Sequence, residues 1–191
     1  DAELVADTLV EADLRGVYSH GIQLLHRYVR GLLNTELNPE PNVQTVVDLG
    51  ALAVIDADCG MGQVASHKAM RLAIAKAKKH GIAAVSVRNS NHHGALAYWG
   101  MMAVDNGMMG MVTTNGPAIM APMGGITETL GNNPICYAIP AGSGYPIVLD
   151  MAVSTAARNK IRVASAAGTK IPLDWAFDRT GRPTDDPDVA L

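Results

Sequence analysis

The sequence predicts an α/β fold, in which strand-helix-strand crossover units follow a smaller helical part at the N-terminus. From residue 43 onward, short β-like runs alternate with segments of helical periodicity, which is the pattern of crossover connections in an α/β sheet. The composition agrees, because the 191 residues are 48% hydrophobic but only 4% aromatic. A core of Ala, Val, Ile, Leu and Met suits packed helices and buried parallel strands.

Residues 1–42 are expected to form a separate helical segment. Apolar residues within 1–15 fall mostly on one helical stripe and are followed by a glycine, which is a common helix stop. A turn carrying Ser19-His20-Gly21 comes next, and a second helix is expected over residues 22–33. A polar, Pro-rich stretch then closes the segment.

Residues 43–191 are expected to form the nucleotide-binding α/β region. Strands are expected at 51–57, 82–88, 108–114, 135–139 and 147–149, and helices at 63–80, 95–106 and 152–164. The last two strands are joined by a turn-rich connection. The Pro- and Asp-rich stretch 168–188 is expected to lie on the surface.

Charge and hydropathy argue against nucleic acid or a membrane as partner. With 15 basic and 18 acidic side chains the formal net charge is -3, so no general positive field attracts nucleic acid or anionic lipid. No apolar run approaches the ~18 residues needed to span a bilayer. We expect a cytoplasmic protein whose two cysteines, Cys59 and Cys136, are free, buried thiols.

One segment, residues 60–65, satisfies the dinucleotide-binding pattern G-x-G-x-x-A between an expected strand and an expected helix. The acidic residue that such a loop requires ~20 positions later is replaced by Arg88, although an arginine could meet a 2′-phosphate. Asp56 and Asp58 also place negative charge where phosphates would sit. We prefer an ordinary tight turn with close helix-sheet packing, and phosphate binding is the alternative.

Two turns carry the histidines that proton transfer needs. His20 lies in a loop next to glycine, from which an imidazole can project into a cleft, and packing of the turn is the structural alternative. His92 lies in Asn89-Ser90-Asn91-His92-His93-Gly94, where a strand ends and a helix begins. Ligands gather at such strand ends in open α/β sheets. Helix capping by Ser90 or Asn91 is the structural alternative there.

The sequence gives less support to a hydrolase than to an enzyme that uses these histidines for proton transfer. No G-x-S-x-G elbow is present, and Ser19 cannot be activated by its neighbour His20 without unusual backbone geometry, which disfavours a serine hydrolase. A zinc hydrolase built on His20, His92 and His93 would need three or four converging ligands, but neither H-E-x-x-H nor paired C-x-x-C occurs. We therefore expect no metal.

Three further turns place polar groups at strand ends. Residues 113–117 and 131–134 carry amide side chains and glycine, where the backbone can approach a ligand closely, although turn chemistry explains each. Asp150 lies at the junction of an apolar strand and an expected helix. An N-cap is the default interpretation of Asp150, and a functional carboxylate is the alternative.

Taken in order, these segments resemble the type-2 malate/L-lactate dehydrogenase family, which includes ureidoglycolate and sulfolactate dehydrogenases, diketogulonate reductase and cyclic imino acid reductases. The matching segments are DLRGVYSHG (13–21), NSNHHG (89–94), APMGG (121–125), GNNP (131–134) and LDMA (149–152). The stretches 171–176 and 181–187 are similar too, so the likeness covers essentially the whole chain.

The resemblance implies an NAD(P)-dependent oxidoreductase, usually a homodimer, whose nucleotide-binding domain is α/β but not a Rossmann fold. It would transfer a hydride between NAD or NADP and C2 of a small 2-hydroxy or 2-oxo acid. A cyclic imino acid reductase and a non-catalytic nucleotide-binding module are the alternatives. His92 is then the expected acid/base residue, His20 orients or shares the proton, and Ser19 is the third expected catalytic residue. The residues expected to contact the cofactor are Thr114, Asn115, Asn132, Asn133, Asp150, Met151 and Ala152. The resemblance also removes the phosphate-loop role from residues 60–65.

The sequence departs from the family in places. Leu24 stands where many members carry an arginine suited to the substrate carboxylate, so another cation must bind that group. The candidates are Arg27, Arg30 and Arg158. Asn132 replaces a threonine, and Gly116 stands where small hydroxyl residues are common. The family is also longer, so we expect the chain to be truncated at both ends and to lack a segment that helps bind the nucleotide.

Overall fold

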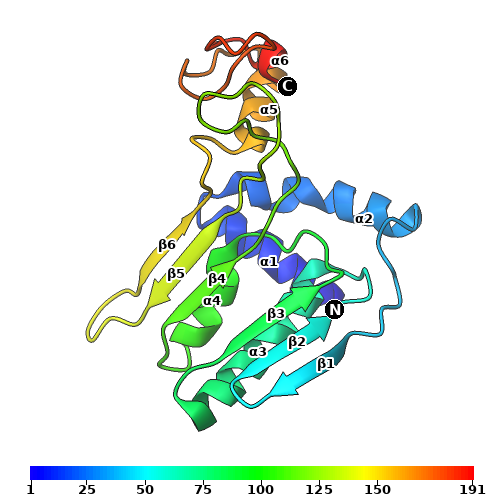
Figure 1. Cartoon of the computed structure of the whole chain (residues 1–191), viewed down its shortest axis with the longest axis vertical. Coiled ribbons are helices and arrows are strands. Elements are labelled where there is room, and N and C mark those ends of the chain that lie inside the picture. Colours follow the sequence, from blue (N-terminus) through cyan, green and yellow to red (C-terminus); the bar gives the residue numbers. More distant parts are fainter. The chain divides into compact units, whose positions relative to one another are not determined.

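The computed structural model describes residues 1–191, which divide into two compact units. The first unit comprises Asp1–Val112 and Cys136–Leu149, and the second comprises Thr113–Ile135 and Asp150–Leu191. The mixture of helices and strands confirms the predicted α/β class (Figure 1).

The helical elements are α1 (Ala2–Leu14), the 3-10 turns η1 (Tyr18–His20) and η2 (Ile22–Leu24), α2 (Leu25–Leu33), α3 (Gly62–His80), α4 (Leu96–Val104), α5 (Arg158–Ala166) and α6 (Pro187–Ala190). The strands are β1 (Gln44–Leu49), β2 (Leu52–Asp56), β3 (Ala84–Arg88), β4 (Gly110–Thr113), β5 (Ile135–Ile139) and β6 (Ile147–Met151).

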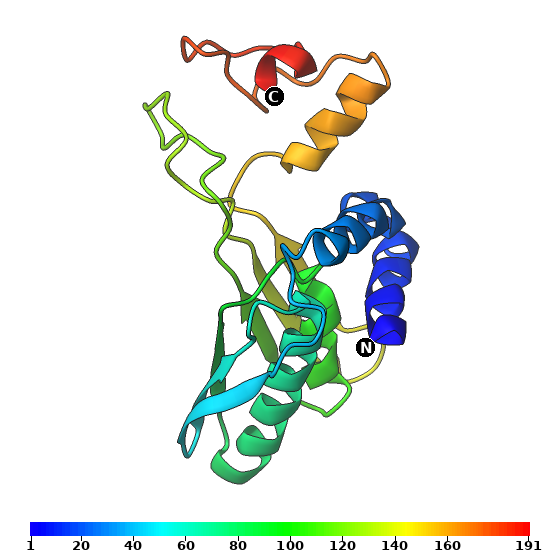
Figure 2. The same cartoon turned by 90° about the vertical axis from the view of Figure 1, so that its right-hand side faces the viewer.

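The first sheet has the order β1-β2-β3 and is mixed. β1 pairs with β2 in an antiparallel hairpin, whereas β2 pairs in parallel with β3 through the crossover helix α3. Ala53 and Ile55 of β2 are buried, and α3 runs along one face of the sheet (Figure 2). A three-stranded mixed sheet differs from the larger parallel sheet of a Rossmann domain, which agrees with the non-Rossmann prediction.

The second sheet has the order β4-β5-β6 and packs against α4. Leu96 and Ala97 of α4 are buried against Cys136 of β5. Gly100 allows this close contact, because a Cβ there would come within 3.0 Å of the Cβ of Ala138. Both cysteines are free, as predicted, but Cys59 is exposed and only Cys136 is buried.

The N-terminal helices pack through a small apolar cluster of Val5, Leu9, Leu24 and Tyr28. Leu24 is 6% exposed, so the departure from the family at this position fills core space. No helix in the chain is both long enough and apolar enough to cross a membrane.

The structure corrects several sequence-based expectations. Strand β1 was not predicted, because all six of its residues are exposed and the segment shows no alternating pattern. The helix expected from residue 152 begins at Arg158, since β6 continues through Met151 and no side chain caps α5. The default interpretation of Asp150 as an N-cap is therefore wrong.

Capping of α4 by Ser90 or Asn91 is also wrong, because Ala95 is the N-cap residue and no side chain caps this helix. The Asn91 side chain instead donates hydrogen bonds to the carbonyl oxygens of Cys59 (2.8 Å) and Gly60 (3.0 Å). Asn91 thus ties the turn after β3 to the turn after β2.

We expect Gly62→Ala to disturb this junction. A Cβ at residue 62 would lie 2.2 Å from the carbonyl oxygen of Asn91 and 2.6 Å from that of His92, and backbone atoms cannot move aside cheaply. The variant should lose ~1–3 kcal/mol or more of unfolding free energy, the usual cost of overpacking, measured by urea denaturation. Gly142→Ala, where a Cβ meets nothing within 4 Å, is the control. Equal stability of the two variants would contradict the close contact.

Candidate active site

The structure brings Ser19, His20 and His92 together within the first unit. The imidazole rings of His20 and His92 are stacked, with centroids 5.5 Å apart and an interplanar angle of 23°. Ser19 Oγ and Nδ1 of His20 form a hydrogen bond of 2.9 Å. Two turns far apart in the sequence thus present their predicted catalytic side chains at one place.

Asp13 of α1 positions the Ser-His-Gly turn. Its Oδ2 accepts a hydrogen bond from the backbone N–H of Ile22 at 2.9 Å, which orders the start of η2. The same carboxylate fills the space beside Gly21, where a Cβ would lie 1.7 Å from Oδ1. Glycine is therefore needed at residue 21 for steric reasons, and this need accounts for part of the Ser-His-Gly pattern.

Tyr28 of α2 contacts the opposite edge of the site. Its hydroxyl lies 2.6 Å from Nδ1 of His92, and the two rings are 5.9 Å apart. The backbone N–H of Gly94 also points at this nitrogen, at 3.4 Å. Sequence reasoning missed Tyr28, because it occupies an apolar helix face that reads simply as core.

The surroundings keep both groups uncharged near neutral pH. Burial is the main cause that lowers the pKa of His92 to about 3, with smaller contributions from the positive charges of His20, Arg27 and His93. Burial also raises the pKa of Tyr28 to about 12, against the opposing effects of Gln63 and Arg27. A neutral imidazole therefore faces a protonated phenol.

The side chain of His93 points away from His92 and Tyr28, toward the core. Its Nδ1 forms a 3.1 Å hydrogen bond with Ser66 Oγ of α3, and its ring stacks on Trp99. The Trp99 Nε1–H donates to the carbonyl oxygen of His93 at 3.1 Å. Burial is the main cause that lowers the pKa of His93 to about 4. No group of three or more His, Cys, Asp or Glu side chains in residues 1–191 is arranged to hold a metal ion.

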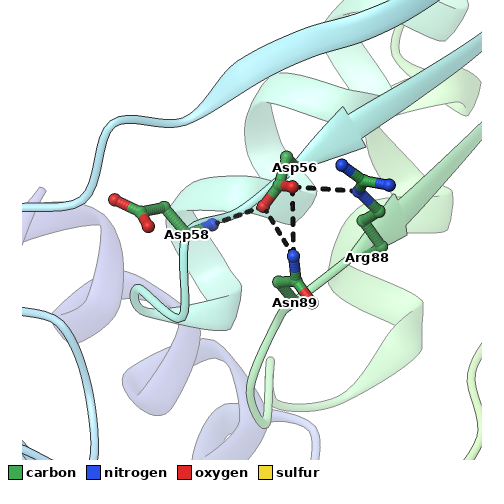
Figure 3. Close-up of polar contacts among 4 residues, drawn as sticks. All are labelled: Asp56, Asp58, Arg88 and Asn89. Carbon is green, nitrogen blue, oxygen red and sulfur yellow. Dashed lines mark hydrogen bonds and ion pairs between the residues drawn. The ribbon is translucent and has the colours of Figure 1, made fainter.

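Asp56, at the end of β2, holds the turn that leads to His92 (Figure 3). Its Oδ1 accepts from the backbone N–H of Asp58 at 3.0 Å, and its Oδ2 accepts from Arg88 Nε at 2.9 Å. Both carboxylate oxygens also accept from Asn89 Nδ2, at 3.1 and 3.0 Å. These hydrogen bonds, led by that from the Asp58 backbone, lower the pKa of Asp56.

The two strand-end turns joined by Asp56 have unusual backbone angles. Asp58, Cys59 and Asn89 are non-glycine residues with φ values of 49°, 56° and 50°. Such conformations persist where the surrounding structure compensates for them. The Cys59 N–H donates to the Asn89 carbonyl oxygen at 2.8 Å, so the two turns stabilise each other.

Packing explains the glycines of the G-x-G-x-x-A segment. A Cβ at Gly60 would lie 2.5 Å from Cγ of Pro41, and Gly62 lies against the backbone of residues 91 and 92. Arg88 is paired with Asp56. These contacts support the tight-turn interpretation of residues 60–65.

The loops predicted to contact the cofactor adjoin one another in the second unit. The Thr114 N–H donates to the Pro134 carbonyl oxygen at 3.3 Å, and the Val153 N–H donates to that of Asn132 at 2.9 Å. The Gly116 N–H donates to Asn133 Oδ1 at 2.9 Å. The structure therefore assembles the 114–116, 131–134 and 151–153 segments into one group.

Two departures from the family compensate for each other in this group. A Cβ at Gly116 would lie 2.7 Å from Oδ1 of Asn132. The Asn132 amide thus uses space that a side chain at residue 116 would need. Asparagine at one position and glycine at the other form a matched pair.

A cavity of about 100 Å³ adjoins His92. Its lining residues come from α2, the segment after α2 and the two strand-end turns: Arg27, Tyr28, Gly31, Glu36, Leu37, Met61, Asn91 and His92. Arg27 is thus the candidate cation that lies beside His92. Arg158, another candidate, donates from Nη2 to the Leu191 carbonyl oxygen at 2.7 Å in the second unit.

Comparison with known proteins identifies the family to which the chain belongs. The malate/L-lactate dehydrogenase family model matches residues 1–191. The malate dehydrogenase of Pyrococcus abyssi is 46% identical over 184 residues, which are 96% of this chain and 51% of that protein. The sulfolactate dehydrogenase structure from Methanocaldococcus jannaschii matches with a TM-score of 0.90 and 44% identity, over 100% of this chain and 55% of that one.

A more distant match is the structure of the delta1-piperideine-2-carboxylate reductase from Pseudomonas syringae pv. tomato. Its TM-score is 0.93 at 29% identity, over 100% of this chain and 57% of that one.

The α/β fold is shared with solved structures of dehydrogenases. The chain belongs to the malate/L-lactate dehydrogenase family, as the resemblance predicted. It spans about half the length of the curated relatives it matches.

His92 and His93, which are half-buried and have lowered pKa values, predict that acid destabilises the fold. Their pKa values in the folded protein, about 3 and about 4, lie below the ordinary value of 6.5, so the unfolded chain binds more protons between these limits. The free energy of unfolding should therefore be highest above pH ~6.5 and fall with decreasing pH, by up to ~1.4 kcal/mol per pH unit for each histidine.

Urea unfolding at several pH values from about 4.5 to 7.5 measures this slope. His92→Gln should make the slope shallower than in the parent protein, because it removes one of the two histidines with a lowered pKa. A His92→Gln slope as steep as the parent slope would contradict the assignment.

Proposed function

We propose that the protein is a cytoplasmic, homodimeric NAD(P)-dependent oxidoreductase that transfers a hydride between the nicotinamide and C2 of a small 2-hydroxy or 2-oxo acid. The observation that carries the proposal is the neutral His92, stacked on His20 beside a small cavity. The names of the relatives support the substrate class, because malate, lactate and sulfolactate are all 2-hydroxy acids.

Oxidation of a 2-hydroxy acid removes a hydride from C2 and a proton from the hydroxyl, so an acid/base residue must lie within ~3 Å of that oxygen. His92 is proposed for this role, with His20 and Ser19 orienting or sharing the proton. The carboxylate of a bound substrate would offset the Arg27 charge that contributes to the lowered pKa of His92.

The second unit is proposed to hold the nicotinamide cofactor. The Thr114 hydroxyl and the amides of Asn115, Asn132 and Asn133 supply donors and acceptors that suit ribose and carboxamide groups. A Cβ at residue 131 would lie 2.4 Å from the carbonyl oxygen of Gly116, so glycine at residue 131 lets the two loops pack closely. Asp150, Met151 and Ala152 complete the proposed set. When bound, the nicotinamide donates or accepts the hydride.

Arg27 is proposed to bind the substrate carboxylate in place of the arginine that Leu24 replaces. It lines the cavity beside His92, and its charge lowers the pKa values of both His92 and Tyr28. A guanidinium group can hold a carboxylate through two parallel hydrogen bonds. Arg27 is exposed, so its charge is free to meet a ligand from solvent.

An apolar stripe on η2 and α2 supports the proposed homodimer. Ile22, Leu25, Val29 and Leu33 follow one another at helical spacing and are 56%, 42%, 46% and 78% exposed. They lie on a different face of the helix from the buried Leu24, Tyr28 and Gly31. An exposed apolar stripe of this kind is typical of an interaction surface.

Reduction of a cyclic imino acid is the second candidate function, favoured by the structural match to the piperideine carboxylate reductase. The carbon that accepts the hydride is then part of a C=N bond. The same Arg27 would bind the carboxylate. A non-catalytic nucleotide-binding module would turn over neither substrate.

Absorbance of the reduced nicotinamide separates these functions. We expect turnover with at least one member of a panel of 2-hydroxy and 2-oxo acids, tested beside cyclic imino acids and with both NAD and NADP. His92→Asn should lower kcat by ~10²–10⁴-fold while the cofactor still binds, because general acid/base catalysis contributes that much. Near-normal turnover by this variant would exclude His92 as the acid/base residue.

Arg27→Gln tests the carboxylate site. Loss of a charged hydrogen bond of ~1.5–3 kcal/mol should raise the KM for the acid substrate by ~10–150-fold, with a smaller effect on the KM for the cofactor. Arg30→Gln, three residues further along α2 and outside the cavity lining, is the matched control and should change neither KM. Equal effects of the two substitutions would rule out a specific role for Arg27.

A further inference from the structure

The hydroxyl of Tyr28 is in an unusual position for a core tyrosine, because its partner is the imidazole proposed to transfer the proton. Tyr28 is 4% exposed, and its oxygen lies 2.6 Å from Nδ1 of His92. The ring is fixed in the apolar cluster with Val5, Leu9 and Leu24. The hydroxyl therefore has little freedom to turn away from this nitrogen.

The direction of this hydrogen bond follows from a second contact. The backbone N–H of Gly94 points at the same Nδ1 atom from 3.4 Å, and a backbone N–H can only donate. Burial keeps the Tyr28 phenol protonated and the His92 ring neutral at ordinary pH. With two donors facing Nδ1, that nitrogen must accept, and the single ring proton of a neutral imidazole must sit on Nε2.

We propose that Tyr28 is a positioning residue that holds His92 in the tautomer with its proton on Nε2, so that His92 meets the substrate oxygen as a hydrogen-bond donor. This inference rests on the proposed function for its catalytic meaning. The tautomer itself depends only on contacts within the first unit.

In this tautomer His92 is ready to donate a proton, as the reducing direction of the reaction requires. With a bound reduced nicotinamide supplying the hydride to C2 of the oxo acid, the carbonyl oxygen would take its proton from Nε2. Nδ1 then takes the Tyr28 proton, so that the imidazole stays neutral and the negative charge moves to the phenol oxygen. After the product leaves, solvent returns a proton to Nε2 and the Nδ1 proton moves back to the Tyr28 oxygen, which restores the starting tautomer.

Gln63 of α3 is placed to support the phenol oxygen in this sequence. Its side chain is fully buried, and its proximity lowers the pKa of Tyr28. Neither Nε2 nor Oε1 of this amide has a partner within hydrogen-bonding geometry. An unpaired buried amide is costly, and it leaves N–H groups that can donate to a Tyr28 oxygen that has lost its proton.

Nitrogen-15 NMR of the imidazole rings tests the tautomer directly, with the His92 signals identified by their loss in His92→Gln. In the unmodified protein we expect Nδ1 of His92 to be unprotonated and Nε2 to carry the proton. Tyr28→Phe keeps the ring and removes the donor, so the two tautomers should mix and both nitrogen signals should shift. Tyr98→Phe removes a hydroxyl that donates to Asp7 and should leave the His92 signals unchanged.

A proton on Nδ1 of His92 in the unmodified protein would overturn the inference, whatever the variants do. So would His92 signals that do not change in a folded Tyr28→Phe protein. In the oxo acid reduction, Tyr28→Phe should lower kcat by more than tenfold and change the KM for the acid by less than about threefold, because uniform binding is kept. If no acid is turned over while the tautomer is as expected, the proposed function fails and the positioning role of Tyr28 remains.

Discussion

Helix α3 begins against the backbone of Asn91 and His92, so closely that residue 62 has no space for a Cβ. Asn91 reinforces this contact through its hydrogen bonds to the turn that precedes α3. Asp56 adds a second connection, because its carboxylate joins the ends of β2 and β3. The location of His92 is thus determined by the sheet and by its crossover helix. His20, Tyr28 and the adjoining cavity are all arranged around that point.

Burial has opposite consequences for the two groups that meet at this point. It removes charge from the His92 imidazole and keeps the proton on the Tyr28 phenol, so a neutral acceptor meets a neutral donor. As a result, the His92 imidazole is a weak base when no substrate is bound. The Arg27 guanidinium adds to this effect, and an anionic substrate would reverse it. Substrate binding and proton transfer are therefore coupled through local charge in the proposed mechanism.

Local sequence patterns predicted most of the helices and strands and the two histidine turns. Ser19, His20 and His92 come together as the motif order suggested, although their catalytic roles stay predictions. Tyr28 and Gln63 could not be found in this way, because a tyrosine or glutamine on a helix shows no sign of its long-range partner. Strand β1 was not predicted, because it is stabilised by hairpin pairing with β2 and buries none of its residues. Asp150 was misassigned since strand β6 runs further than its apolar residues indicate.

A crystal structure with a nicotinamide nucleotide and oxamate, an unreactive analogue of a 2-oxo acid, would test the proposed roles of His92, Arg27 and Tyr28 most directly. We expect the oxamate carbonyl oxygen to accept a hydrogen bond from Nε2 of His92, its carboxylate to bind Arg27, and the Tyr28 hydroxyl to remain hydrogen-bonded to Nδ1. Oxamate bound away from His92, or with its carboxylate on another cation and Nδ1 of His92 facing the ligand, would contradict these roles.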